Sequence, residues 1–127
     1  MSPASRPTPD RAVLADAAEV FQLLGSPGRL HLLWILSDDE VDVTTLVAAV
    51  GGTKAGISQH LAKLRLAGWI DARRDGQHVR YRVVDPDIVA LVHRAVTYVL
   101  DDQAPPGPQP SPIARRRMAM TVENRPE

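Results

Sequence analysis

Residues 53–83, TKAGISQHLAKLRLAGWIDARRDGQHVRYRV, decide the fold of this chain. From Thr53 to Ala67 apolar residues recur at helical spacing, and Gly68 then suits the end of a helix. From residue 70 onward the apolar period is two, and Asp75-Gly76 interrupts it as a hairpin turn does. The stretch therefore predicts a helix followed directly by a β-hairpin.

Helices are also predicted on both sides of this stretch, over residues 10–24, 27–36, 43–50 and 86–102. Ser26 before Pro27, and Asp42 before the third helix, are typical N-cap residues. Residues 37–40 read as an acidic loop, and residues 51–52 as a tight glycine turn before the fourth helix. Four helices, a hairpin and a last helix predict a mainly α fold with a small β-hairpin, the winged helix-turn-helix.

The length of 127 residues fits one small domain. Residues 1–9 hold three prolines and residues 103–127 hold six, so both ends are predicted to be disordered and residues 10–102 to form the domain. The absence of cysteine excludes a disulfide scaffold, thiolate metal ligands and a cysteine nucleophile. The sequence has no apolar run of about 18 residues and no apolar stretch near its start, so a cytoplasmic protein is expected.

The zero net charge hides an uneven distribution. Residues 10–52 carry −5, residues 53–82 carry +5 and residues 83–102 carry −3. A basic block inside an acidic domain is a candidate surface for a polyanion such as DNA. A solvated basic face without a partner has the same composition, so charge alone leaves both interpretations open.

The helix predicted over residues 53–67 has an apolar face of Ile57, Leu61 and Leu64. On the opposite face Gln59 and Lys63 lie among small residues, which allow a helix to approach the floor of a DNA groove. A glutamine can bind adenine through two hydrogen bonds, and a lysine can reach guanine or phosphate. Residues 53–70 contain no acid, so we predict that this helix reads the major groove of double-stranded DNA.

In the hairpin, alternation directs Val79, Tyr81 and Val83 toward the core and the cationic residues of the same strand away from it. Such a ribbon can follow the DNA backbone or enter the minor groove. The alternative is an edge strand that its arginines protect from aggregation. The predicted DNA-binding residues are Thr53, Lys54, Ser58, Gln59, His60, Lys63, Arg73, Arg74, Gln77, His78, Arg80 and Arg82.

The first and last predicted helices have wider apolar faces than a packed monomer needs, which predicts a homodimer with both helices at its seam. A two-fold dimer places its two reading helices about 34–36 Å apart, one turn of DNA. The predicted interface residues are Leu14, Ala17, Phe21, Ile88, Val92, Ala95, Val96 and Val99.

Several segments resemble the ArsR/SmtB family of winged-helix repressors, namely LLGSPGRLHLLWIL (23–36), SQHLAKLRLAGWI (58–70), RRDG (73–76) and YRV (81–83). The resemblance covers about residues 12–102 and is greatest to the actinobacterial branch that senses nickel and cobalt. It implies a homodimeric repressor on a palindromic operator, released by a metal or another small effector.

The metal sites that the resemblance implies are incomplete. Where the family has thiolates early in the third helix, residues 41–45 contain no sulfur. On the last helix Val89, Leu100 and Gln103 stand where imidazoles or a carboxylate are expected, and only an aspartate matches. The alternatives to a metal are an apolar effector at the seam, a partner, or no effector, with His93 then purely structural. The candidates for a nickel, cobalt or zinc site across the dimer are Asp87, His93 and Asp101.

Enzyme motifs do not emerge, because the sequence has no Gly-rich phosphate loop, Ser/His/Asp arrangement or paired-carboxylate pocket. A competing interpretation is a winged-helix module that binds another protein, for which an acidic fourth helix would be typical. Gln59 and Lys63 favour DNA instead.

Overall fold

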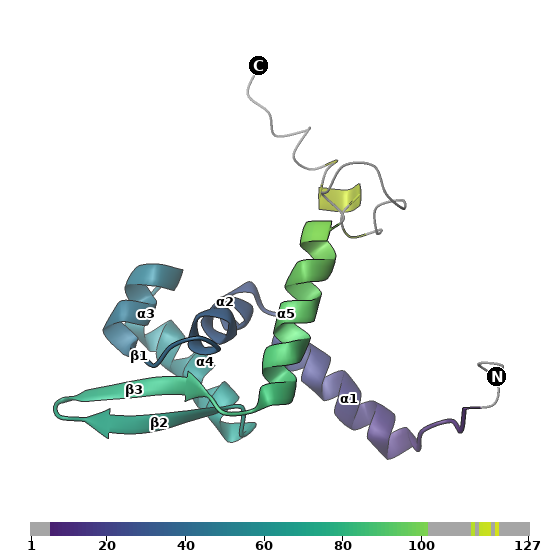
Figure 1. The fold of residues 1–127 in the computed structure, drawn as a ribbon, viewed down its shortest axis with the longest axis horizontal. Coiled ribbons are helices and arrows are strands. Elements are labelled where there is room, and N and C mark those ends of the chain that lie inside the picture. The colour runs from purple at the N-terminus through teal and green to yellow at the C-terminus, as the bar shows by residue number, and fades with distance from the viewer. Residues whose placement is uncertain (1–5, 102–112, 114, 118, 120–127) are drawn as a thin grey trace.

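The computed structural model describes residues 6–101, 113, 115–117 and 119. Its elements are α1 (Arg11–Leu24), α2 (Pro27–Leu36), β1 (Val41–Asp42), α3 (Val43–Val50), α4 (Lys54–Leu66), β2 (Ile70–Asp75), β3 (His78–Val83) and α5 (Pro86–Asp101). Figure 1 shows the hairpin of β2 and β3 extending to one side of the helices, with α5 and α1 toward the other side. The predicted winged helix-turn-helix is confirmed.

The predicted disorder of residues 1–9 and 103–127 falls largely on residues outside the described part. Within the tail, the described residues 113, 115–117 and 119 have helical backbone. The disorder of the two ends therefore stays a prediction.

The sheet has three antiparallel strands in the order β1-β3-β2, one more than the predicted hairpin. In β1, Val41 pairs with Tyr81 and Asp42 pairs with Arg80 of β3. A strand of two residues is too short to show an alternation of apolar and polar side chains, so the sequence pattern could not reveal it. As a consequence, Glu40, which directly precedes β1, comes to lie beside the hairpin.

The two predicted N-caps, Ser26 and Asp42, are confirmed, and Thr53, predicted as the first residue of the fourth helix, is its N-cap. The Ser26 side chain accepts a hydrogen bond from the backbone N–H of Arg29 (3.3 Å) at the start of α2. Asp42 accepts from the N–H of Thr45 (2.9 Å) at α3, and Thr53 accepts from the N–H of Gly56 (3.0 Å) at α4. Each cap satisfies a backbone donor that has no partner within its helix, and so fixes where the helix begins.

Two glycines end elements as predicted. Gly68, with φ of +80°, follows α4 in the left-handed conformation that favours glycine. Gly76, with φ of +64°, lies in the two-residue turn between the paired residues Asp75 and His78. The hairpin therefore follows α4 at once, which holds the wing next to that helix.

The core is built around α2, whose Leu32, Leu33 and Leu36 are buried. Ile88 and Val92 of α5 also belong to this core, at 4% and 0% exposure. Their assignment to the dimer interface was therefore wrong. The wide apolar arc of α5 has two halves. One half is buried and packs within the chain, and the other half faces outward.

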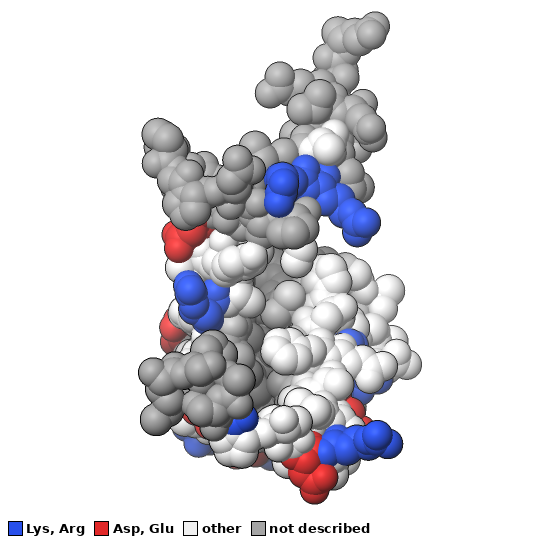
Figure 2. All heavy atoms as spheres, turned by 90° about the vertical axis from the view of Figure 1, so that its right-hand side faces the viewer, with Lys and Arg blue, Asp and Glu red and all other residues white. Residues whose placement is uncertain are grey.

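Other apolar residues of α1 and α5 face outward, although Leu24 at the end of α1 belongs to the core. Phe21 is 66% exposed and Leu14 is 52% exposed on α1, and Tyr98 and Leu100 are exposed on α5. Figure 2, which views the molecule from the side of α1 and α5, shows a broad uncharged surface between charged margins. None of the described helices combines the length and the apolar character needed to cross a bilayer.

Candidate nucleic-acid interface

The helix α4 is fixed to the core by one face only. Ile57, Leu61 and Leu64 are buried, whereas Gln59 and Lys63 are exposed. Both exposed side chains lie on the face opposite the buried stripe, because successive residues rotate by about 100° around a helix. The helix therefore presents an amide and an ammonium group to solvent, as the sequence predicts. Thr53, Lys54 and Ser58 are exposed as well.

His60 occupies a different position from the other predicted contacts on α4. It is half-buried, and its Nδ1 lies 3.5 Å from Nη1 of Arg29. The Arg29 Nε donates to the carbonyl of Leu23 (2.6 Å), which holds this guanidinium at the start of α2. Burial lowers the pKa of His60, and the charges of Arg29 and Lys63 lower it further. The geometry gives His60 a contact with α2 rather than a position on the exposed face.

The two faces of the hairpin carry different charges. Side chains of directly paired residues lie on the same face of a sheet, and alternate residues lie on opposite faces. The pairs Ala72–Tyr81 and Arg74–Val79 therefore share the face toward the helices. The opposite face, here called the outer face, carries Asp71, Arg73, Asp75, His78, Arg80 and Arg82 of the hairpin.

On the outer face, two arginines and one histidine of the hairpin contact carboxylates. Nε and Nη2 of Arg73 donate to the two carboxylate oxygens of Glu40 at 2.9 and 3.0 Å. Nε of Arg80 donates to Asp75 at 3.1 Å, and Nδ1 of His78 lies 3.5 Å from Oδ2 of Asp42.

These contacts shift the ionisation of the two carboxyls that β1 brings to the hairpin. The hydrogen bond from Arg73 lowers the pKa of Glu40, and the charges of Arg82 and Arg80 lower it further. Hydrogen bonds from Thr45 lower the pKa of Asp42. Both groups are therefore carboxylates at neutral pH.

These carboxylates cancel the net positive charge of the wing. The four arginines of β2 and β3 against Asp71 and Asp75 leave +2, and Glu40 and Asp42 reduce this to zero. Arg74, Gln77 and Arg82 are exposed, and neither of these two arginines forms an ion pair within residues 6–101. Val79, predicted to face the core, is 37% exposed because it lies beyond the edge of the helices.

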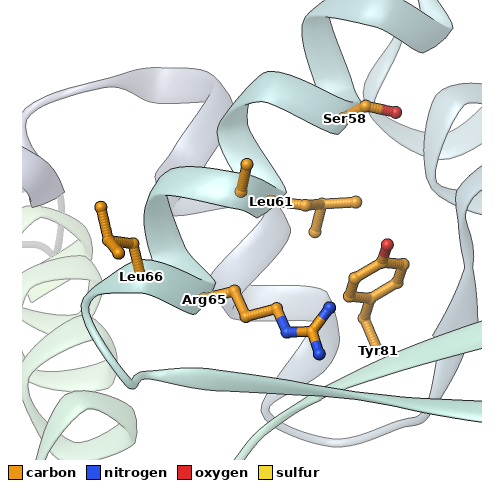
Figure 3. Close-up of a pocket in the computed structure, with 6 residues that line it drawn as sticks. Ser58, Leu61, Arg65, Leu66 and Tyr81 are labelled. Atoms are coloured by element: carbon orange, nitrogen blue, oxygen red, sulfur yellow. The ribbon is translucent and has the colours of Figure 1, made fainter.

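A groove of about 440 Å³ separates α4 from the wing (Figure 3). In that view the Arg65 side chain extends from α4 toward Tyr81 of β3, with Ser58 nearer the start of the helix. The sequence prediction included Ser58 but missed Arg65 and Tyr81. Arg65 belongs to the basic block, which was a usable signal, whereas Tyr81 was assigned to the core by alternation. A guanidinium and two hydroxyl groups along one groove are suited to the phosphates of a DNA strand.

Comparison with known proteins supplies the family. Residues 26–72 match the family described as "Bacterial regulatory protein, arsR family". The HTH-type transcriptional regulator KmtR of Mycobacterium tuberculosis is 41% identical over 90 residues, which cover 71% of this chain and 68% of the relative. The chain belongs to the ArsR family. It is accordingly a DNA-binding transcriptional regulator, and the family consists of regulators rather than enzymes.

Two further relatives of this ArsR-family chain are named as repressors. A probable mercury resistance operon repressor of Streptomyces lividans is 36% identical over 87 residues, covering 68% of this chain and 70% of the relative. The crystal structure of the AntR antimony-specific transcriptional repressor superposes with a TM-score of 0.71 at 26% identity, covering 81% of this chain and 96% of that one.

The candidate metal ligands do not come together within one chain. The described residues contain no group of three or more His, Asp or Glu side chains arranged to hold a metal ion. Along α5, Asp87 and Asp101 are about 9 and 12 Å from His93 by helical rise. The His93 ring instead stacks on Trp34, with centroids 4.6 Å apart, and its Nε2 is buried without a hydrogen-bond partner among the described residues.

Proposed function

We propose that this ArsR-family regulator is a repressor that binds a palindromic operator as a homodimer in the cytoplasm. In this proposal α4 enters the major groove, Gln59 reads a base and Lys63 contacts a base or a phosphate. The observation that carries it is the exposure of both side chains opposite the buried stripe of α4, next to the groove that separates α4 from the wing. The repressors of S. lividans and the AntR structure support the direction of regulation.

The backbone contacts are assigned to groups around that reading face. Thr53, Lys54 and Ser58 lie at the start of α4, where free backbone N–H groups and the helix dipole favour a phosphate. Arg65 and Tyr81 line the groove, so a DNA strand that passes between α4 and the wing would contact them. Arg74 lies on the wing face toward the helices and extends the same surface.

The dimer is supported by the outward apolar side chains of α1 and α5. Phe21 and Leu14 are more than half exposed, which is costly for large apolar groups of a monomer in water. On α5, Ala95, Val96 and Val99 line an apolar hollow of about 270 Å³. A second copy that packs α1 and α5 against this surface would cover both.

Selection of bound sequences from a random duplex library tests the proposal. We expect a palindromic consensus with half-sites about 10 base pairs apart and two chains per duplex. Phe21→Glu places a charge in the proposed seam, so it should yield monomers by sedimentation and lose operator binding. An asymmetric site bound by one chain would overturn the dimer, and a library without enrichment would overturn sequence-specific binding.

For the effector, we propose nickel, cobalt or zinc bound across the dimer, with His93 as the nitrogen donor and aspartates of both subunits as oxygen donors. The metal and metalloid named for two relatives support a metal effector. The buried, unpartnered Nε2 supports His93. Calorimetric titration of each metal into wild type and His93→Gln tests this. Equal binding by both proteins removes His93 from the site, and no binding by wild type removes the metal.

A further inference from the structure

The pair formed by Glu40 and Arg73 joins two segments that are far apart in sequence. Glu40 directly precedes β1, and Arg73 lies on β2 at the far edge of the sheet, beyond the central strand β3. Both guanidinium contacts are short, so the two carboxylate oxygens occupy one edge of the fork. A DNA phosphate would use the same edge with the same two-point geometry, because its oxygens are spaced like those of a carboxylate.

We propose that Glu40 takes the place of a DNA phosphate on Arg73 and thereby limits sequence-independent binding of DNA by the wing. The inference depends on the proposed DNA interface and adds a residue that acts on it indirectly. Glu40 is a positioning residue, because it acts through Arg73 and not by touching DNA.

The Glu40–Arg73 pair is accessible to a polyanion. The side chain of Arg73 is 56% exposed and that of Glu40 is 28% exposed, so the fork lies at the surface. The lowered pKa of Glu40 means that this competitor stays charged over the whole neutral range. Because the wing has no net charge once Glu40 and Asp42 are counted, loss of one carboxylate converts a neutral wing into a cationic one.

The expected effect follows from counterion release. Each additional phosphate that a cation neutralises steepens the dependence of log K on log salt by about 0.9. One such contact at 0.1 M salt corresponds to a gain of about threefold to tenfold in affinity. Because phosphates carry no sequence information, operator and random duplexes should gain equally.

The test compares Glu40→Gln with Asp38→Asn, a matched control that removes one carboxylate from the same loop. Asp38 is exposed and forms no ion pair within residues 6–101. Glu40→Gln should bind both duplexes about threefold to tenfold more tightly, with a salt slope steeper by about 0.9. Asp38→Asn should leave the slope unchanged.

The double variant Glu40→Gln/Arg73→Gln should bind duplex DNA no more tightly than Arg73→Gln alone. A gain that persists without Arg73, a Glu40→Gln slope equal to that of wild type, or an equal effect of Asp38→Asn overturns the proposal. The elution of the variants from immobilised heparin supplies a readout without DNA. A wild type that binds no duplex overturns the proposed function, whereas Glu40→Gln that elutes with wild type overturns the role of Glu40.

Discussion

The helix α4 and the wing carry similar numbers of cationic residues but differ in how these charges are used. Lys54, Lys63 and Arg65 of α4 belong to a segment without a single acid. Most arginines of the wing lie on its outer face, where Glu40 pairs with Arg73 and Asp75 pairs with Arg80. A charge count along the chain therefore overstates the positive charge that the wing offers to DNA. Affinity for DNA should depend mainly on α4.

The largest expected effect comes from the reading face of α4. Gln59→Ala removes a two-point hydrogen bond to a base, so operator binding should weaken by about 1–3 kcal/mol, or about fivefold to 150-fold. Binding to random duplex should change little, because no phosphate contact is lost. Titration of both duplexes by fluorescence anisotropy measures the two affinities. Equal loss on both would show that Gln59 contacts the backbone.

The two faces of the wing can be compared through adjacent arginines. Arg74→Gln should weaken binding to any duplex about threefold to tenfold and reduce the salt slope by about 0.9, because Arg74 faces the groove side and has no carboxylate partner within residues 6–101. Arg73→Gln should reduce the slope less than Arg74→Gln does, because Glu40 already occupies that guanidinium. Equal slopes for the two variants would contradict the distinction between the faces.

The difference between α4 and the wing also separates the features that the sequence could predict from those that it could not. Helix boundaries to within about one residue, the N-caps Ser26 and Asp42, and the face of Gln59 and Lys63 follow from spacing within one element, and these were predicted. The neutral wing depends on β1, whose two residues carry no pattern of their own. The pairing of Glu40 with Arg73 links positions 33 residues apart, which no local rule detects.

The dimer face illustrates the same limit. The apolar arc of α5 was found by helical periodicity, but periodicity cannot tell which part of a wide arc packs inside its own chain. Ile88 and Val92 are buried in the core of the chain, whereas Leu100 is 60% exposed. Only the packed structure separates the two halves.

A smaller effect is expected in the groove between α4 and the wing. Tyr81→Phe removes one hydroxyl from the groove and keeps the ring, so it should weaken DNA binding by about 0.5–1.5 kcal/mol without a change of the salt slope. Arg65→Gln should reduce the slope by about 0.9, since it removes a charge. The same salt titrations measure both variants. Wild-type affinity in both would place the DNA strand outside this groove.

The smallest expected effect concerns His60, the α4 residue that turns toward α2. Its folded-state pKa is lowered, so between pH 6.5 and that lower pKa the unfolded chain binds a proton that the folded chain does not. The free energy of unfolding should therefore fall as pH decreases below about 6.5, by at most about 1.4 kcal/mol per pH unit for this one proton. Urea unfolding at pH 5 to 8 measures it.

The matched comparison is His60→Gln against His31→Gln, which changes an exposed histidine of α2. His60→Gln should flatten the loss of stability at acidic pH, because its neutral side chain keeps the contact with Arg29 without taking up a proton. His31→Gln should retain the wild-type profile. If His60→Gln instead keeps the wild-type profile, His60 has the same pKa in the folded and unfolded chains. Its packing against Arg29 then has no effect on its ionisation.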